Sequence, residues 1–243
     1  MVQSETTTPL RTVVDPVADP HINGTYLRHN PSWHIEYSPP KAMNIEEILR
    51  RNGLAPRTVC EVGCGAGEVL RQLQLRLPAE CKFWGYDIAP DAIRIASQRQ
   101  NARLQFTLAD FAATPTPRFD LLLVLEVVDH VEDYLGFLRS LKSRAEWKLF
   151  SFTLDVSAQS AVRKSGFHAA REKFRHLHHF NKETALATLR HTGYEVVACS
   201  YGPNHAETLG AKLARPIRAV TFSMNQDFSV RVFGGHALMV LAR

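Results

Sequence analysis

The stretch Glu61-Val62-Gly63-Cys64-Gly65-Ala66-Gly67 constrains the fold of this chain more than any other part of the sequence. It follows a short apolar segment, residues 58–62, and precedes a segment with helical spacing of apolar residues, 69–77. Glycines in such a strand-to-helix turn allow positive φ angles and bring the backbone close to a ligand. The amides at the start of the helix then point toward that ligand. The sequence therefore predicts a Rossmann-like ligand-binding turn.

Strand-like and helix-like segments alternate from residue 57 to residue 152. The almost unbroken apolar run at 121–125 is typical of a strand that is covered on both faces. Pro90 suits the first turn of a helix. Further strands are expected at 81–86, 104–108 and 147–152, and a further helix at 134–141. These repeated units predict an α/β fold: a Rossmann-like, doubly wound, mostly parallel seven-stranded sheet with right-handed crossovers.

The N-terminal flank divides into two parts. Residues 1–20 are rich in Thr, Asp and Pro and are expected to form a flexible arm. Residues 21–54 carry three aromatic residues and a helix predicted at 42–51, which ends at Asn52-Gly53. We interpret residues 21–54 as an N-terminal helical lid.

The C-terminal flank, residues 153–243, is less regular. It is expected to hold a helix at 182–192, and strands at 195–200 and 236–241, with an irregular segment at 201–216. These strands would complete the same sheet. The sequence thus predicts one domain over residues 21–243, with a cofactor-binding core at 57–152 and substrate-side segments at 153–243.

Composition limits the cellular location and the kinds of partner that this chain can have, but it does not identify a partner. The 243 residues carry a formal charge of +5, much of it between residues 163 and 182, and a solvated face is the simplest interpretation of that segment. No apolar run reaches the roughly 20 residues that span a bilayer. No signal peptide is evident, so a cytoplasmic location is expected. The four cysteines are expected to be free thiols. Binding of a membrane or of nucleic acid is therefore disfavoured, and a homodimer is possible.

Two acidic residues follow the next two predicted strands. Asp87 ends the second strand, where a carboxylate can accept hydrogen bonds from both ribose hydroxyls. Asp110 follows the third strand with Phe111 beside it. The structural alternative is that each aspartate only caps a helix or turn. The glycines are spaced Gly-x-Gly-x-Gly, whereas NAD-binding turns have the spacing Gly-x-Gly-x-x-Gly. An NAD-dependent enzyme is therefore the main alternative interpretation, and not the preferred one.

Together, the glycine turn, Asp87 and Asp110 resemble motifs I, II and III of the class I S-adenosylmethionine-dependent methyltransferases, over residues 57–152. The resemblance implies that the cofactor is S-adenosylmethionine and that the acceptor is a small molecule. It also implies a set of cofactor-binding residues: Glu61, Gly63, Gly65, Gly67, Asp87, Ile88, Asp110, Phe111 and Glu126. In this set Asp87 would hold the ribose, Ile88, Asp110 and Phe111 would address the adenine, and Glu126 would face the sulfonium and the acceptor.

The residues of the reacting side are less clear. Val127–Asp133 follows a stretch that is common in the family, and makes His130 a candidate catalytic residue. Tyr26 and Tyr37 are candidates from the lid, because aromatic faces attract a sulfonium; the alternative is that they only pack the lid onto the sheet. His178 and Asn181 are candidates for the wall of an acceptor pocket. His176 and His178 would point to one face of a strand, but no third ligand has informative spacing, so no metal site is predicted.

Three functions stay open at this point. The first is methyl transfer to O, N or C of a metabolite or natural-product intermediate; no Asn-Pro-Pro-Tyr-type motif follows the fourth strand, which disfavours a nucleic-acid acceptor. The second keeps the fold and cofactor but closes the methionine tail to azetidine-2-carboxylate, with release of methylthioadenosine. The third is a non-catalytic protein that binds S-adenosylmethionine.

Overall fold

A seven-stranded sheet forms the centre of the computed structural model, which describes residues 22–163, 167–168, 171, 175–203 and 215–243. The strand order is β3-β2-β1-β4-β5-β7-β6. The strands are β1 (Thr58–Val62), β2 (Lys82–Asp87), β3 (Leu104–Leu108), β4 (Phe119–Leu125), β5 (Ala145–Thr153), β6 (Val196–Pro203) and β7 (His236–Ala242). Strands β1 to β5 are parallel, and β7 runs antiparallel between β5 and β6. The predicted Rossmann-like, mostly parallel seven-stranded sheet is confirmed.

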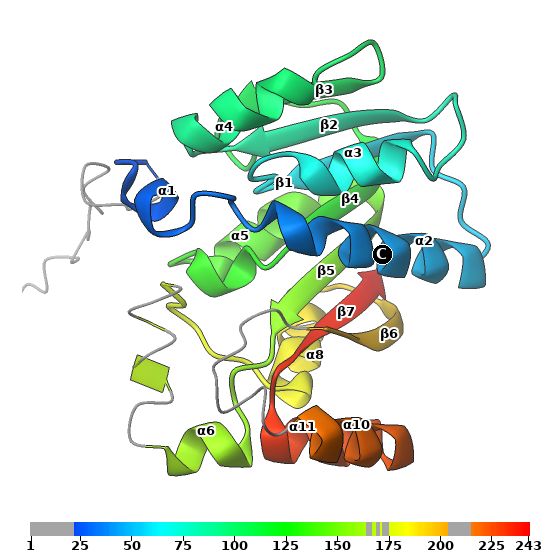
Figure 1. Ribbon diagram of the computed structural model, residues 1–243. Helices are drawn as coiled ribbons and strands as arrows, with labels where there is room; N and C mark the ends of the chain where they lie inside the picture. Colours follow the sequence, from blue (N-terminus) through cyan, green and yellow to red (C-terminus); the bar gives the residue numbers. More distant parts are fainter. Residues whose placement is uncertain (1–21, 164–166, 169–170, 172–174, 204–214) are drawn as a thin grey trace, which may run out of the picture.

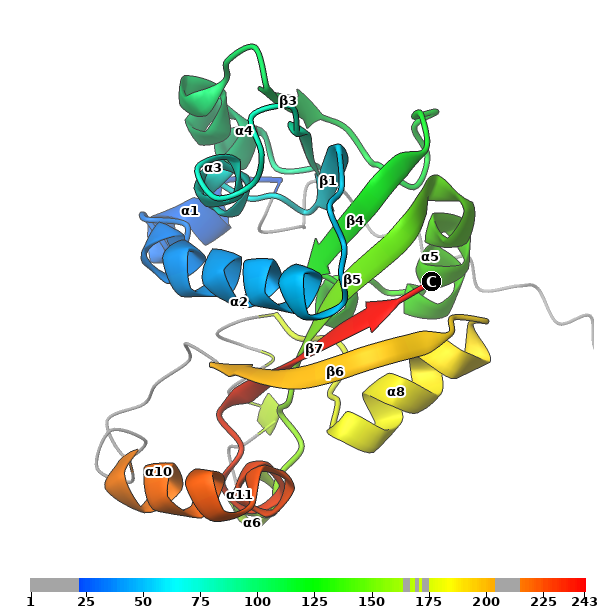
Figure 2. The same ribbon diagram turned by 90° about the vertical axis from the view of Figure 1, so that its right-hand side faces the viewer.

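Helices cover both faces of this sheet (Figures 1 and 2). On one face lie α2 (Ser38–Arg51), α3 (Glu68–Gln74) and α4 (Pro90–Ala96), and on the other lie α5 (Tyr134–Leu141) and α8 (Lys182–His191). Alternate residues of the central strands enter the two cores: Leu121 and Leu123 pack with α2 and α3, whereas Leu122 and Val124 pack with α5 and α8. This alternation is why β4 reads as a continuous apolar run.

The helix of the N-terminal segment begins earlier than the sequence predicts. Its predicted start was Ala42, but α2 begins at Ser38, with prolines in its first turn. Proline is accepted there because its missing N–H has no partner in a first helical turn. The shorter helix α1 (Thr25–His29) precedes it and lies beyond the N-terminal end of α2 (Figure 1). Residues 1–20, predicted to be a flexible arm, lie outside the described residues.

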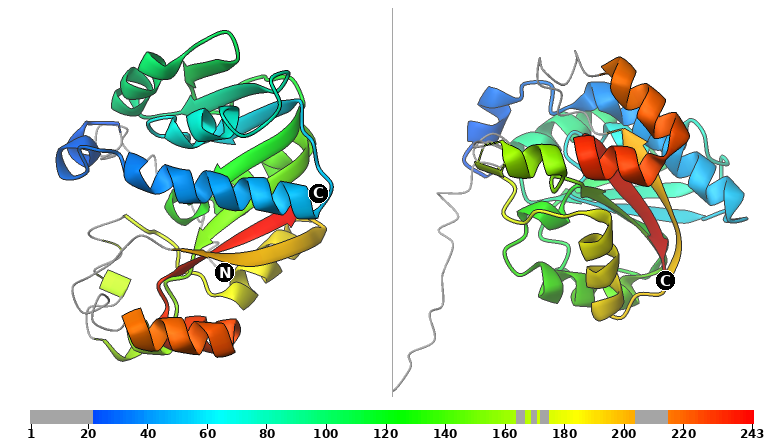
Figure 3. Two further views of the ribbon diagram at one scale, coloured as in Figure 1. Left: turned by 45° about the vertical axis from the view of Figure 1, so that its right-hand side comes forward. Right: turned by 90° about the horizontal axis from the view of Figure 1, so that it is seen from below.

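The C-terminal part of the chain differs from the predictions in its helices and in the length of one strand. Two helices, α10 (Arg215–Met224) and α11 (Gln226–Phe233), occupy a stretch that was expected to be irregular or was left unassigned. They pack beside α6 (Ala158–Val162), as Figure 3 shows, and they lie below β7 in its left view. Strand β6 extends to Pro203, and residues 204–214 of the predicted irregular segment lie outside the described residues. Part of the basic segment 163–182 also lies outside them.

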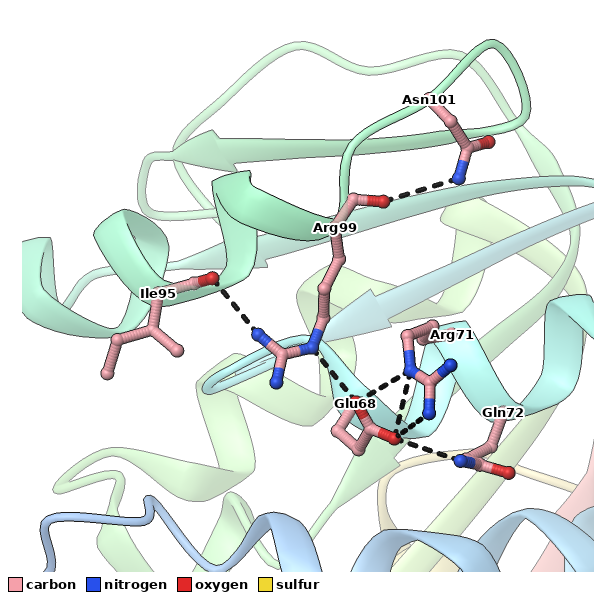
Figure 4. A network of polar contacts seen from close by, with 6 residues as sticks. All are labelled: Glu68, Arg71, Gln72, Ile95, Arg99 and Asn101. Carbon is pink, nitrogen blue, oxygen red and sulfur yellow. Dashed lines mark hydrogen bonds and ion pairs between the residues drawn. The ribbon is translucent and has the colours of Figure 1, made fainter.

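A buried carboxylate joins two of the helices that follow the first strands. Glu68, the first residue of α3, accepts hydrogen bonds from Arg71, Gln72 and Arg99 (Figure 4). Arg99 comes from the short 3₁₀ helix η3 (Ser97–Arg99) that continues α4. The network therefore fixes α3 against the end of α4, directly behind the glycine turn. No helix in the described parts of the chain is long and apolar enough to cross a membrane.

Candidate functional site

The glycine turn lies at the carboxyl end of β1, where the strand order reverses between β1 and β4. Such a switch point is where open α/β sheets bind their ligands. Gly63, Gly65 and Gly67 all have positive φ, at 69°, 52° and 74°. The amides of Gly63 and Cys64 both donate to the Tyr86 carbonyl, at 2.8 and 3.1 Å, so the turn is tied to β2. The predicted turn therefore has both the conformation and the anchoring that a ligand-binding loop needs.

Asp87 lies beside this turn at the end of β2. One carboxylate oxygen, Oδ2, accepts a hydrogen bond from the Gly65 amide at 2.8 Å, and the other, Oδ1, accepts from the Ala89 amide at 2.8 Å. Each carboxylate oxygen can accept further hydrogen bonds, so a side chain held this way can also receive hydroxyl donors. Ile88, the next residue, is exposed. This is the geometry expected for a residue pair at a ribose and an adenine.

Asp110 and Phe111 are less well placed than the resemblance implies. The Asp110 side chain is exposed and Oδ1 accepts from the Ala112 amide at 2.9 Å, so the aspartate caps its own turn. The Phe111 ring is buried in the core beside Tyr86, at 5.1 Å between ring centroids, with the Arg144 guanidinium over it. Because its ring is buried in the core, Phe111 has only its backbone available for the predicted contact with adenine.

Glu61 is buried beneath the turn. Its oxygen Oε2 has no hydrogen-bond partner among the described residues. Burial raises the pKa of Glu61 to about 8, although the positive charge of Lys41 opposes that shift. A carboxyl group in such a place is protonated at neutral pH and can donate a hydrogen bond. It lies under the site and does not line an open surface.

Glu126, directly after β4, has a left-handed conformation with φ of 56°. Such a conformation in a non-glycine residue stores strain and is frequent at functional sites. The Glu126 carboxylate forms an ion pair with the Lys41 ammonium at 2.8 Å, which joins the end of β4 to α2. Lys41 gave no signal in the sequence, because the predicted helix began one residue after it.

The aromatic residues of the N-terminal segment come together at the glycine turn. The Tyr26 and Trp33 rings lie 5.0 Å apart, and His34 stacks on Tyr37 at 6.0 Å. A Cβ added to Gly65 would approach the Trp33 ring to 2.7 Å, so Trp33 packs directly against the turn. Burial raises the pKa of Tyr26 to about 12, and the charges of Glu126 and Asp87 add to the shift. The Tyr26 hydroxyl is therefore a hydrogen-bond donor at neutral pH and not a general base.

The predicted residues of the acceptor side have mixed positions. Asn181 is the N-cap of α8, where its side chain accepts from the Thr184 amide at 2.8 Å. His178 Nε2 contacts the Val131 and Glu132 carbonyls at 3.0 and 3.2 Å. Both side chains therefore have structural roles. His130 contacts the Arg175 carbonyl through Nδ1 at 3.2 Å, which makes Nε2 the acceptor nitrogen of its neutral ring.

The histidine-rich segment differs from the sequence prediction. Residues 175–180 are not a strand, so His176 and His178 do not share a face. Instead, Nδ1 of His176 and Nδ1 of His179 approach Oδ2 of Asp155, at 2.5 and 3.1 Å. Burial lowers the pKa of His176, but the hydrogen bond to Asp155 and the negative charges of Asp155, Asp129 and Glu126 together outweigh burial and leave that pKa raised. Sequence reasoning missed Asp155, because only the fold brings the end of β5 to this segment.

Asp129 lies next to this cluster and is fully buried. Burial raises the pKa of Asp129 to about 7, opposed by the charge of His176. The backbone carbonyl of Asp129 accepts from the Leu177 and His178 amides at 2.7 and 3.2 Å. The loop after β4 thus holds the histidine-rich segment in place. Taken together, the carboxyl ends of β1, β2, β4 and β5 carry one continuous group of polar side chains.

Proteins of similar sequence include methyltransferases. A family model described as a methyltransferase domain matches residues 32–199. The ubiquinone biosynthesis O-methyltransferase of Glaesserella parasuis is 29% identical over 123 residues, which cover 46% of this chain and 51% of that protein. The ajmaline N-methyltransferase of Rauvolfia serpentina is 29% identical over 93 residues, which cover 35% of this chain and 31% of that protein. The matched segments thus span about half or less of these relatives.

Solved structures share the fold at low sequence identity. The magnesium protoporphyrin IX methyltransferase of Synechocystis, with bound S-adenosylhomocysteine, has a TM-score of 0.56 at 16% identity, over 84% of this chain and 81% of that one. The N-methyltransferase NodS of Bradyrhizobium japonicum, in complex with S-adenosylhomocysteine, has a TM-score of 0.53 at 17% identity, over 83% and 86%.

Proposed function

We propose, from the premise that this chain belongs to the methyltransferase-domain family, that it transfers a methyl group to a small-molecule acceptor. The chain is an S-adenosylmethionine-dependent transferase on the class I methyltransferase fold. By their names, the sequence relatives are an N-methyltransferase of ajmaline and an O-methyltransferase of ubiquinone biosynthesis. These relatives support a small acceptor, and they give no support to cyclisation of the cofactor.

The observation that carries this proposal is the fixed Asp87 carboxylate at the switch point of the sheet. Its two hydrogen bonds to the Gly65 and Ala89 amides orient it beside the glycine turn. In the proposed complex Asp87 accepts the ribose hydroxyls, with Ile88 at the adenine and the turn along the ribose and methionine. The Lys41–Glu126 pair offers one cation and one anion, which complement the carboxylate and ammonium of the methionine end.

Methyl transfer requires little covalent catalysis by the protein. The sulfonium supplies an activated methyl group, and the chain has to align the acceptor with it and exclude water. We propose that Tyr26, Trp33 and Tyr37 form a lid that shields the sulfonium. His130 would accept the proton of a protonated acceptor through Nε2.

The Asp87 assignment is tested by calorimetric titration with S-adenosylhomocysteine. Asp87→Ala should weaken binding by well over tenfold, because a charged acceptor of two hydrogen bonds is lost. Glu80→Ala is the matched control, because it also removes one carboxylate, but from an exposed position in the loop before β2, at the opposite end of that strand from Asp87. Circular dichroism shows whether each variant folds. Equal affinity in folded Asp87→Ala and in wild type would refute the assignment.

The lid is tested with Trp33. Trp33→Ala should weaken binding of S-adenosylhomocysteine several-fold, because the ring that covers Gly65 is lost. Trp33→Phe should restore most of the affinity, because it retains an aromatic face. Tighter binding by Trp33→Ala would mean that the indole competes with the cofactor for the turn, and the lid proposal would fail.

The reaction itself is tested by mass spectrometry. The protein is incubated with S-adenosylmethionine alone, and then with the low-molecular-weight or the macromolecular fraction of a cell extract. S-adenosylhomocysteine formed only with the small-molecule fraction supports the proposal. Methylthioadenosine formed from the cofactor alone would indicate cyclisation, and turnover only with macromolecules would contradict a small acceptor.

A further inference from the structure

Three side chains with metal-binding atoms meet on the acceptor side, outside the cofactor residues. Asp155 lies two residues after β5, and His176 and His179 lie in the irregular segment before α8. One ligand atom from each lies within 4.8 Å of the other two. Two imidazole nitrogens approach the same carboxylate oxygen, at 2.5 and 3.1 Å. The sequence predicted no metal site because it showed no third ligand near the histidines. The fold supplies that third ligand, Asp155.

The ligand set has the chemistry of a transition-metal centre. Two histidines and one carboxylate bind zinc in many hydrolytic enzymes and iron(II) in oxygenases. Donor atoms at about 2.0–2.2 Å from a zinc ion lie roughly 3.2–3.6 Å from one another. The two contacts to Asp155 need to open by only about 1 Å or less to reach such spacing. The side chains of His176, Asp155 and His179 are 9%, 15% and 21% exposed, so the cluster is sheltered but reachable.

A second observation is independent of these three residues. Asp129 is 0% exposed; the Thr153 side chain lies close enough to its carboxylate to lower its pKa, but neither carboxylate oxygen has a hydrogen bond of good geometry among the described residues. Charges on His176 and on Asp155 both act on it, so its carboxylate lies close to the cluster. A buried carboxylate with so few hydrogen bonds is costly unless a positive charge compensates it. A divalent cation held by Asp155 and two neutral histidines leaves a net charge of +1, which Asp129 would balance.

The backbone also prepares the site. The Asp129 carbonyl accepts hydrogen bonds from the Leu177 and His178 amides, which lie between the two histidine ligands. His178 is fixed to the Val131 and Glu132 carbonyls. The loop that carries His176 and His179 is therefore held at its centre by the loop after β4. Such outer contacts orient first-shell ligands and raise metal affinity.

We propose that Asp155, His176 and His179 bind one divalent transition-metal ion of the zinc class, with Asp129 as its buried counter-charge. Three protein ligands leave at least one coordination position open, as in catalytic zinc sites. The charge of Glu126 contributes to the raised pKa of His176, so the two side chains lie near each other. Because Glu126 is one of the proposed cofactor-binding residues, the metal site would lie beside the cofactor. If the proposed methyl transfer holds, the open position suits an oxygen atom of the acceptor.

Metal binding is measured directly, so the test does not depend on turnover. Untagged full-length protein is stripped with a chelator and titrated with Zn²⁺ by calorimetry and with Co²⁺ by visible absorption. Wild type should bind one ion per chain and give the intense visible bands of cobalt in a site of low coordination number. His179→Ala and Asp155→Asn should each weaken Zn²⁺ binding about 100-fold or more, and Asp129→Asn about 10- to 100-fold.

His191→Ala is the matched control, because His191 is exposed at the end of α8, away from the cluster. It should bind Zn²⁺ like wild type. Titration with S-adenosylhomocysteine shows that each variant is folded, and it separates failure of the metal site from failure of the cofactor assignment. The proposal is overturned if folded wild type binds Zn²⁺ no more tightly than His179→Ala, since the cluster is then only a hydrogen-bonded group.

Discussion

Two glycines, Gly67 and Gly53, have similar backbone conformations in very different surroundings. Gly67 and Gly53 have φ of 74° and 66°. A Cβ at Gly67 would lie 2.3 Å from the Phe106 ring and 3.1 Å from Ala96, whereas a Cβ at Gly53 meets nothing within 4 Å. Gly67 is thus required both by its φ angle and by the close approach of β3 and α4.

Substitution by alanine separates these two requirements. Gly53→Ala should lower the free energy of unfolding by about 1 kcal/mol, which is the cost of a positive φ in a non-glycine residue. Gly67→Ala should lower it by about 2–4 kcal/mol, because overpacking against Phe106 is added. Urea unfolding measures both values. Equal losses in the two variants would show that the Phe106 ring moves aside without cost.

At the scale of elements, the Glu68 network decides how α3 and α4 sit behind the glycine turn. Burial disfavours the ionised form of Glu68, but hydrogen bonds from Arg71, Gln72 and Arg99 outweigh burial and hold its pKa at about 2. Figure 4 shows that Arg99 reaches the carboxylate from the neighbouring helical segment. The ion pair therefore joins two elements, and not only neighbours on one helix.

A pH dependence of stability follows from the lowered pKa. A carboxyl group whose folded pKa lies below its unfolded value stabilises the fold above the unfolded pKa, near 4.5, and loses that contribution as pH falls toward 2. Glu68→Gln should therefore lower the melting temperature at pH 7, and the difference from wild type should shrink below pH 4.

Glu47→Gln is the matched control for Glu68→Gln, because the pKa of Glu47 is also lowered to about 2, by hydrogen bonds from Arg50 and Arg51 on its own helix. Its pairs are exposed and local, so its effect at pH 7 should be smaller. Both variants are followed by thermal unfolding at several pH values. A larger effect of Glu47→Gln would contradict a linking role for Glu68.

At the scale of the whole molecule, the proposed cofactor would touch the ends of β1, β2 and β4 and the N-terminal segment together. A ligand that binds only the folded chain at 100 times its Kd stabilises it by about 2.7 kcal/mol. For a chain of this size, S-adenosylhomocysteine should then raise the melting temperature by roughly 5–11 °C. Asp87→Ala, which should bind more than tenfold more weakly, should show less than about half of this shift at the same concentration, and a full shift there would contradict the proposed binding mode.

The sequence predicted well wherever the physical signal is local. The turn at residues 61–67, the strand at 104–108 and the helix at 134–141 have the predicted positions, because glycine conformation and apolar periodicity act over a few residues. The start of α2 and the helices α10 and α11 were missed. Proline pairs usually mark turns, so Pro39 and Pro40 were interpreted as a turn and not as the first turn of α2. The segments 215–224 and 226–233 do carry apolar residues at helical spacing, so a local signal for α10 and α11 was present and was not used.

By itself the sequence determined the sheet type, the glycine turn and Asp87 at the end of its strand, because each depends on residues adjacent along the chain. Only the tertiary structure decided the rest of the site. It paired Lys41 with Glu126 across 85 positions, placed Trp33 on Gly65, turned Phe111 into the core and brought Asp155 to His176 and His179. These contacts join residues that are distant in sequence, and the crossovers of the sheet, which no local pattern encodes, bring them together.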